Sequence, residues 1–308
     1  MICFGGLPAR RARRSIIESD PGNPRFVSPN TLSGSFCASS RTGDDRPVFF
    51  HSTVKVTTNP CSSCGLCCRS YLVPVFGHDL YRLVKHRNLD PRSFTFICEQ
   101  EQPDKVGFRL SGNGPTYGIA LDKKDKLEVS QPCTFLIEEP DGSSHCGVYE
   151  DRPIACAAYP MAGAARRVVM MPAALCPPGA WAANEGDNPQ WGIELRRLAR
   201  YRDTYVEVVN RWNAWVESVP DVSRPPEHFV AYVLQVYERL AALDIQLGAE
   251  AVASIEQAWA WLPEDAPASG SSQDEPNWVA YLRRVREVID QFFPDLPPLP
   301  FARIAIER

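Results

Sequence analysis

Apolar positions recur at three- and four-residue steps through the last third of the chain and predict amphipathic helices. The four stripes run from Leu198 to Val219, Phe229 to Leu243, Val252 to Leu262 and Trp278 to Phe292. The segments between them are rich in Pro (220–226) or in Ser and Gly (268–272), and Pro294 ends the last stripe. Because Trp and Tyr fall on the stripes, we interpret them as core residues rather than as a cofactor site.

Shorter apolar runs separated by turn residues precede these helices and predict β-strands. We expect strands near residues 54–58, 106–110, 117–121, 126–129 and 167–171. Cys133 and Cys146 flank a short strand and a turn at 141–144, so a hairpin would bring the two thiols together. Leu80, Leu83 and Val84 predict a helix over 79–89, with Asp79 as its N-cap.

The first 52 residues mix Pro, Gly, Ser, Asn and Arg without a sustained apolar period. We therefore predict an N-terminal tail over 1–52 that is disordered or weakly ordered, a cysteine-rich region over 53–182 and a helical domain over 183–308. The predicted fold class is α+β: a small metal-binding domain with short antiparallel strands, followed by an all-α domain.

The chain has 308 residues and a net charge of −4, which argues against a surface that binds nucleic acid. Four arginines on one predicted helix are expected on a solvated face: Arg196, Arg197, Arg200 and Arg202. We find no run of about 18 apolar residues and predict no membrane span. The early arginines precede Ser-Ile-Ile-Glu instead of an apolar stretch, so we expect a cytoplasmic protein.

Eleven cysteines are present, and four of them fall between Cys61 and Cys68. The spacing of Cys61, Cys64 and Cys67 is the Cys-x2-Cys-x2-Cys run that holds iron–sulfur clusters in ferredoxins. Gly65 fits a sharp turn with φ above zero after the second ligand. Neighbouring side chains diverge, so Cys68 is expected to serve a second centre or to stay a reduced thiol.

A second set of thiols follows at Cys133, Cys146, Cys156 and Cys176. Proline lies close to several of these cysteines, and it fixes the loops beside the ligands. Cys3 and Cys37 lie in the predicted tail, and Cys98 is interpreted as a buried thiol, so we do not expect these three to bind metal. His78 and His86 are possible ligands by chemistry, but a single His near a helix end is commonly a surface or capping residue.

The combined motif resembles the YkgJ-like cysteine-cluster family over about residues 58–180. It comprises Cys-x2-Cys-Gly-x-Cys-Cys, then Cys-x-Phe-Leu, then Cys-x-Val-Tyr-x-x-Arg-Pro-x-x-Cys-x-x-Tyr-Pro. The resemblance implies a zinc- or iron-chelating domain, and because the family includes flagellin lysine-N-methylases, it also implies a possible protein-modifying activity. Members commonly carry Arg where this chain has Ala157. Arg152 and Tyr159 are expected to contact the bound metal group, Arg152 by offsetting thiolate charge.

Eight cysteines are thus predicted metal ligands: Cys61, Cys64, Cys67, Cys68, Cys133, Cys146, Cys156 and Cys176. They suit two four-thiolate centres, one [4Fe–4S] cluster with a zinc ion, or one cluster with spare thiols. Three close cysteines with a remote fourth favour an iron–sulfur cluster, with zinc as the alternative. The radical-SAM spacing is absent, because Tyr71 stands where its last Cys would fall, and no Gly-rich nucleotide loop occurs.

Two functions remain open from the sequence. The first is a cytoplasmic iron–sulfur protein with a redox or protein-modifying role, acting on a protein substrate or with a redox partner. The second is a non-catalytic zinc-stapled binding module whose helical domain docks a partner. The sequence does not decide whether the protein is an enzyme.

Overall fold

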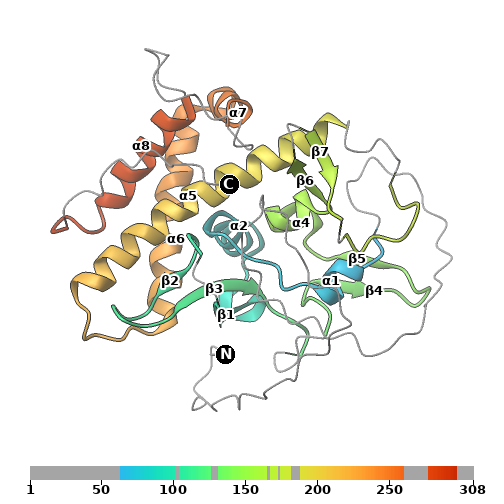
Figure 1. Ribbon diagram of the computed structural model, residues 1–308, viewed down its shortest axis with the longest axis horizontal. Coiled ribbons are helices and arrows are strands. Elements are labelled where there is room, and N and C mark those ends of the chain that lie inside the picture. The colour runs from blue at the N-terminus through green and yellow to red at the C-terminus, as the bar shows by residue number, and fades with distance from the viewer. Residues whose placement is uncertain are drawn as a thin grey trace, which may run out of the picture.

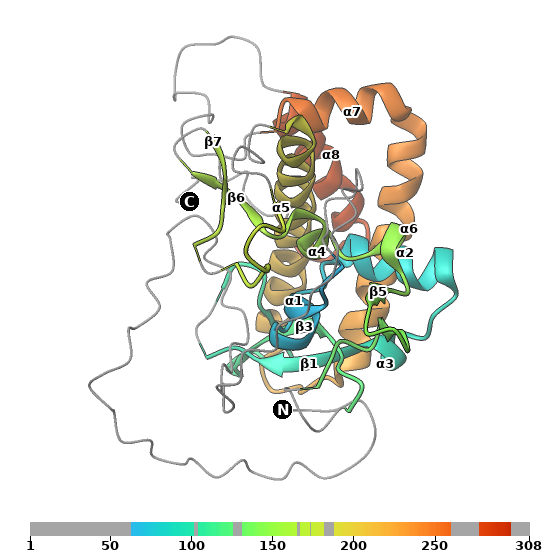
Figure 2. The same ribbon diagram turned by 90° about the vertical axis from the view of Figure 1, so that its right-hand side faces the viewer.

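The computed structural model describes residues 63–101, 104–125, 131–164, 167–172, 174–181, 188–259 and 277–296. Helices gather on one side of the molecule and short strands on the other, and the long helix α5 runs across the molecule between them (Figure 1). Figure 2 shows α5, α6 and α8 side by side, with β1 and β3 beyond one end of the bundle. The predicted α+β class is confirmed.

All four predicted helices are present. They are α5 (Pro189–Ser218), α6 (Pro226–Leu247), α7 (Ala249–Gln257) and α8 (Asn277–Asp290). The side chain of Asn188 caps α5 by accepting a hydrogen bond from the backbone N–H of Gln190, 3.0 Å away. Gly248, with φ at 85°, separates α6 from α7. The aromatic stripe is buried, as Tyr205 and Trp212 are each 2% exposed, which confirms that it forms core.

The helix predicted over 79–89 is α2 (Gly77–Arg87), which begins two residues earlier than expected. Phe76 is its N-cap, and Asp79 lies one turn further in, so the prediction of Asp79 as N-cap is wrong. The Asp79 carboxylate accepts hydrogen bonds from the backbone N–H of Phe76 at 3.2 Å and of Ile154 at 2.9 Å. Ile154 begins helix α4 (Ile154–Ala158), so one buried carboxylate joins the N-termini of two helices.

The strands form one three-stranded sheet and two hairpins. The sheet has the antiparallel order β1-β3-β2, from β1 (Thr95–Glu99), β2 (Phe108–Arg109) and β3 (Thr116–Leu121). The hairpins pair β4 (Leu136–Glu138) with β5 (Ser144–Cys146), and β6 (Met161–Ala164) with β7 (Arg167–Met170). The predicted strands at 106–110, 117–121 and 167–171 are confirmed, and β1 and β6 were not predicted. The strands predicted at 54–58 and 126–129 lie outside the described residues.

Three short helical segments complete the described elements of the cysteine-rich region. They are α1 (Leu66–Ser70), α3 (Pro91–Phe94) and the 3-10 turn η1 (Tyr149–Asp151). Asp151 receives ion pairs from Arg82 at 3.0 Å and from Arg87, both on α2. These contacts hold η1, which lies between Cys146 and Cys156, against α2.

One hydrophobic core joins the strands to the helices. Leu80 and Leu83 of α2 are fully buried and belong to the same apolar cluster as Val233 and Val236 of α6. The rings of Phe108 on β2 and Phe229 on α6 stack at a centroid distance of 3.8 Å. Helix α2 therefore packs its apolar face against the helical half while it follows directly after the first cysteine motif.

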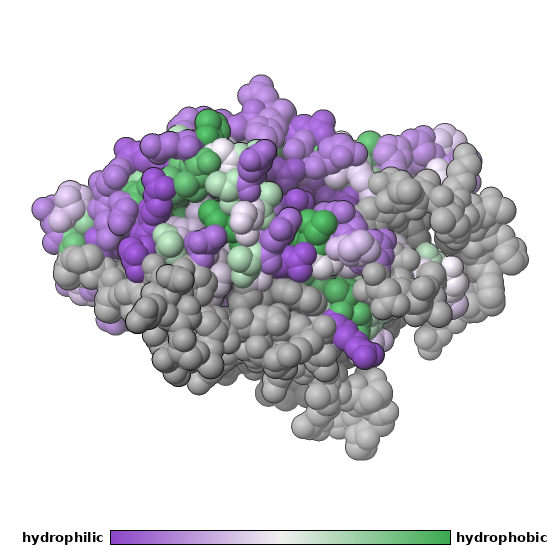
Figure 3. All heavy atoms as spheres, turned by 90° about the horizontal axis from the view of Figure 1, so that it is seen from above, coloured by the Kyte–Doolittle hydropathy of each residue, from purple (hydrophilic) through white to green (hydrophobic). Residues whose placement is uncertain are grey.

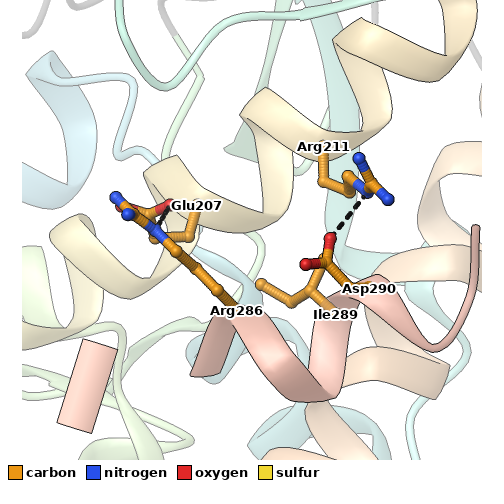
Figure 4. Close-up of a pocket in the computed structure, with 5 residues that line it drawn as sticks. All are labelled: Glu207, Arg211, Arg286, Ile289 and Asp290. Carbon is orange, nitrogen blue, oxygen red and sulfur yellow. Dashed lines mark hydrogen bonds and ion pairs between the residues drawn. The ribbon is translucent and has the colours of Figure 1, made fainter. Parts of the chain in front are cut away.

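Ion pairs between the helices account for several buried charges. Arg200 is only 4% exposed, and its Nε lies 3.1 Å from a carboxylate oxygen of Glu256 on α7, so the expected solvated face is wrong for this arginine. A pocket between α5 and α8 is lined by Glu207, Arg211, Arg286, Ile289 and Asp290 (Figure 4). Its charges pair across the interface, Arg286 with Glu207 at 2.6 Å and Arg211 with Asp290 at 2.9 Å. Because each charge is matched, we interpret this pocket as a helix contact.

Where the described residues form the surface seen from above, it is mostly hydrophilic, and hydrophobic residues appear there in small areas (Figure 3). None of the helices in the described ranges is long and apolar enough to cross a membrane.

Candidate metal centre

The first cysteine motif turns at Gly65. Its φ is 70°, which confirms the predicted turn with positive φ, and it forms the N-cap of α1. A Cβ at this position would lie 2.3 Å from a terminal nitrogen of Arg69, whose flexible side chain can move aside, so it is the positive φ that favours glycine here. The turn places Cys64 before the helix and Cys67 and Cys68 within its first turn.

Cys67 and Cys68 do not diverge. Their sulfur atoms lie 4.0 Å apart, so the prediction that these neighbouring side chains point apart is wrong. The pKa of the Cys68 thiol is lowered to about 7, first by the hydrogen bond with Cys67. The positive charges of Lys123 and Arg69 lower it further, and burial opposes them. Cys68 is therefore substantially a thiolate near neutral pH, which is the form that binds metal.

Lys123 is a site residue that the sequence did not reveal. It is only 4% exposed, and its ammonium donates hydrogen bonds to the carbonyls of Cys68 at 3.1 Å, Arg69 at 3.4 Å and Tyr71 at 2.9 Å. These carbonyls lie at the C-terminal end of α1, where helices have unsatisfied acceptors. Burial lowers the pKa of Lys123, and negative charge on the surrounding cysteines, Cys133 first, opposes that shift. The buried ammonium group of Lys123 thus lies among the thiols.

Arg69 of α1 joins this helix to the β4–β5 hairpin. Its guanidinium donates a hydrogen bond of 2.6 Å to the carboxylate of Glu138 on β4 and one of 3.4 Å to the hydroxyl of Ser144 on β5. Helix α1 and the β4–β5 hairpin therefore lie against each other, as Figure 1 shows. The contact brings the first cysteine motif to the second across about seventy residues of sequence.

The β4–β5 hairpin presents Cys133 and Cys146, as the sequence predicted. Cys146 pairs with Leu136, whose N–H donates to the carbonyl of Cys133 at 2.9 Å. The backbone N–H of Cys133 donates to the carbonyl of Cys68 at 2.8 Å, and Cys133 also bridges to Lys123. Burial raises the pKa of the Cys133 thiol to about 11.

Cys156 lies on α4, whose first turn is held by Asp79. Burial raises the pKa of Cys156 well above its ordinary value, and the charges of Cys133, Cys68 and Cys146 raise it further. Burial likewise raises the pKa of Asp79 to about 7, and the hydrogen bonds from the two helix N-termini oppose this shift. Cys68, Cys133, Cys146 and Cys156 are consequently near enough to act on one another electrostatically.

Cys176 lies with a different set of side chains. The backbone N–H of Leu175, beside Cys176, donates to the hydroxyl of Tyr159 at 2.5 Å, and the ring of Tyr159 meets that of Tyr71 edge to face at 5.6 Å. Burial raises the pKa of Tyr159, and the charges of Cys176, Tyr71 and Cys67 raise it further. The tyrosine pair therefore stands beside both Cys67 and Cys176, and Tyr159 lies close to two predicted ligands.

Arg152, the other residue expected at the metal group, stacks its guanidinium carbon 4.0 Å from the centroid of the Tyr149 ring. Its Nε and one terminal nitrogen are buried without a hydrogen-bond partner. Its contact with a metal group stays a prediction.

The remaining candidates lie elsewhere. Cys98 sits on β1 and packs with Phe96 and Ala120, in a cluster separate from the main core. It is disulfide-bonded, so the interpretation of Cys98 as a buried thiol is wrong. The ring of His78 stacks on Tyr201 of α5 at 3.8 Å, and His86 is an exposed side chain 3.6 Å from Asp151. Cys3, Cys37 and Cys61 fall outside the described residues.

The donor set fits a thiophilic metal. Among the described residues, seven cysteines carry free thiols: Cys64, Cys67, Cys68, Cys133, Cys146, Cys156 and Cys176. Thiolates are the preferred ligands of zinc and of iron–sulfur clusters. Within the part of the chain that the structure describes, no three Cys, His, Asp or Glu side chains are yet close enough to hold one ion. Binding would therefore require the gathered thiols to move closer together.

The arrangement agrees with a comparison to known protein families. Residues 60–177 match the CxxCxxCC family model. The family is described as "Putative zinc- or iron-chelating domain", and the matched range contains all eight predicted ligands. The match confirms the resemblance predicted from the cysteine motifs and supports a metal-binding protein. Neither the curated proteins nor the solved structures gave a match to the chain.

Proposed function

We propose that this chain is a cytoplasmic iron–sulfur protein, and that its CxxCxxCC region holds a [4Fe–4S] cluster. The cluster would serve electron transfer to a redox partner or the modification of a protein substrate. Cys64 and Cys67 would be ligands from the close run and Cys176 the remote ligand. Cys61 joins them by its spacing alone, since it lies outside the described residues.

The observation that carries this proposal is the tyrosine pair between Cys67 and Cys176. Tyr71 follows the first motif and Tyr159 follows α4, and the charges of both cysteines act on both phenols. Cys176 therefore lies near the first motif, although 108 residues separate it from Cys67 in the sequence. A compact run of thiols joined by a distant one is the usual ligand set of a [4Fe–4S] cluster.

A bound cluster supplies reversible one-electron chemistry, and the protein sets its conditions. The thiols must lose their protons to bind, and the cations near α1 favour that loss at Cys68, the neighbour of Cys67. The aromatic rings of Tyr71 and Tyr159 would shield one side of the site from water. Such shielding and the nearby charges are the means by which proteins tune a reduction potential.

The zinc-stapled module remains the second candidate, and one observation favours it. The Cys64–Cys67 spacing and the Cys133–Cys146 hairpin are two pairs of thiols held on short turns, and zinc sites are commonly built from two such pairs. In that case the metal would be structural, and the helical half would dock a partner.

Anaerobic purification of the full chain, followed by iron, zinc and acid-labile sulfide analysis, distinguishes the two functions. We expect iron and sulfide in similar amounts, and their loss in Cys64→Ser and in Cys176→Ser. Zinc without labile sulfide in the anaerobically purified wild type would contradict the iron–sulfur function and favour the module.

A further inference from the structure

We infer that the outer edge of strand β7 binds an extended peptide segment with an acidic side chain, which adds a third strand to the β6–β7 hairpin. The inference rests on the proposed function in taking this segment to belong to its protein substrate or redox partner. The binding itself depends on the backbone of β7 and does not require a bound metal.

The pairing within the hairpin shows which backbone groups of β7 point outward. The N–H of Met171 donates to the carbonyl of Pro160 at 2.9 Å, so the backbone groups of Met171 face the β6 side. Successive residues of an antiparallel strand direct their N–H and C=O groups to opposite sides. Val168 and Met170 therefore direct theirs away from β6, and the outer edge of β7 presents two N–H and two C=O groups.

These outward groups are accessible to a partner strand. Strand β6 contacts α5, and β7 lies further from that helix (Figure 2). Met170 of β7 is 40% exposed, whereas Met161, its neighbour on β6, is 2% exposed. Within the described ranges, the outward N–H and C=O groups of Val168 and Met170 have no hydrogen-bond partner.

The edge of β2 in the three-stranded sheet provides a contrast, because side chains of α5 complete its hydrogen bonds. Asn213 accepts the N–H of Arg109 at 2.8 Å and donates to the carbonyl of Gly107 at 3.0 Å. Trp212 donates to the carbonyl of Arg109 at 2.7 Å. Proteins commonly cover strand edges, since an uncovered edge pairs with other chains. Strand β7 has no such cover among the described residues, and it therefore offers the kind of edge that extended peptides join.

Arg167 determines the charge of the segment that fits this edge. It is the first residue of β7, it is exposed, and it makes no ion pair with another described residue. Opposite charges on paired residues of neighbouring strands stabilise the pairing, so an Asp or Glu across from Arg167 is favoured and a Lys is disfavoured. The side chains of Val168 and Met170 share one face of the strand, which favours apolar residues on that face of the segment.

The hairpin leads directly to the candidate metal centre. Strand β6 follows Tyr159 and Pro160, and the chain continues from β7 through Met171 to Cys176. The hydroxyl of Tyr159 accepts the N–H of Leu175 at 2.5 Å, which joins the two ends of the hairpin. A segment paired with β7 is therefore held with one end beside the thiols, where a cluster would act on it or exchange electrons with its protein.

The test mixes the full-length chain, as purified, with a fluorescein-labelled probe peptide, Thr-Val-Thr-Glu-Thr-Val-Thr, and with a control peptide in which Lys replaces Glu. Fluorescence anisotropy measures the affinity, and hydrogen-exchange mass spectrometry locates the bound peptide. We expect saturable binding of the Glu peptide and slower exchange at the amides of Val168 and Met170. The Lys peptide should bind about fivefold more weakly, and Arg167→Glu should reverse this preference.

Met170→Pro removes one outward N–H without breaking a hydrogen bond to β6, and an edge strand tolerates proline where the N–H faces solvent. This variant should bind the Glu peptide about tenfold more weakly, whereas the control Met170→Thr, which keeps the N–H, should bind like the wild type. A Glu peptide with alternate backbone nitrogens methylated should not bind. This peptide leaves the protein unchanged, so it covers the case in which Met170→Pro fails to fold.

The outcomes distinguish this inference from the proposed function. Unchanged exchange at Val168 and Met170, or equal binding of the methylated and unmethylated peptides, overturns the inference, even if iron and sulfide are present. Slow exchange of these amides in the chain without peptide also overturns it: a dependence on protein concentration would identify a second copy as the occupant, and its absence a segment of the same chain. Equal affinity for the Glu and Lys peptides overturns the acidic specificity. Peptide binding at β7 in a chain without iron or sulfide upholds the inference and contradicts the iron–sulfur function.

Discussion

Replacing Lys123 by Met tests whether the buried ammonium organises the cysteine site. Methionine keeps the length and apolar stem of the side chain but removes the donors and the charge. The carbonyls of Arg69 and Tyr71 then lose their Lys123 hydrogen bonds, at 3.4 Å and 2.9 Å, while that of Cys68 keeps its bond from Cys133.

The expected loss of stability follows from these contacts. A buried acceptor that loses its donor costs about 1–3 kcal/mol, and two partly buried carbonyls lose the Lys123 hydrogen bond here. Removal of a desolvated charge offsets part of this cost, so we expect the metal-free protein to lose about 2–4 kcal/mol of unfolding free energy. With an m-value of about 2–3 kcal/mol/M, the urea midpoint should fall by about 1 M.

The matched control is Lys124→Met, one residue away. Lys124 is an exposed side chain, and its ammonium pairs with Glu138 at 3.1 Å in water. Exposed ion pairs contribute less than about 1 kcal/mol, so this control should shift the midpoint little. Equal midpoints for the two variants, measured by urea unfolding under reducing conditions, would refute the assigned role of Lys123.

Three further predictions concern the reactivity of two thiols, the role of Arg152 and the packing of two glycines. In the metal-free chain at pH 7.5, Cys68 should react with iodoacetamide far faster than Cys133, because the pKa of Cys68 is about 7 and that of Cys133 about 11. The rate at Cys68 should fall as the pH drops below 7, and peptide mass mapping measures both rates. Arg152→Gln should keep the fold but lower metal occupancy or the reduction potential, with partial recovery in Arg152→Lys, and wild-type values in the Gln variant would exclude an electrostatic role. Gly77→Ala would place a Cβ 2.1 Å from a buried tyrosine ring of α6 and should cost about 1–3 kcal/mol, whereas Gly192→Ala, open to 3.5 Å on α5, should be neutral or stabilising in thermal unfolding.

Local periodicity was sufficient to predict the helices. The stripes of α5, α6 and α8 repeat over three or more turns, and Pro or Gly marks most of the ends of the four helices, so each helix is specified within its own segment. The β4–β5 hairpin was predictable for the same reason, because a short turn fixes the pairing of its neighbours. Gly65 was predictable because only its own φ was at issue.

Features that depend on distant partners were not predictable. Lys123 lies in an Asp-Lys-Lys-Asp turn that suggests a solvated loop, and only tertiary contacts show that the first lysine points inward and the second outward. Arg200 looked like a surface charge because Glu256 and Asp244, its partners, lie more than forty residues away. Asp79 was assigned as an N-cap because Ile154, the start of α4, cannot be recognised as its partner from spacing.

The continuity of the core has a consequence for how the molecule responds to metal. Leu80 and Leu83 of α2 follow the turn at Gly65 by fifteen and eighteen residues, and they are buried with Val233 and Val236 of α6 in one packed cluster. Tightly packed interiors transmit small displacements instead of absorbing them. Closure of the thiols around a metal would therefore displace α2 and, through it, the helical bundle. Because such coupling is reciprocal, a partner that binds the bundle would change the affinity for the metal.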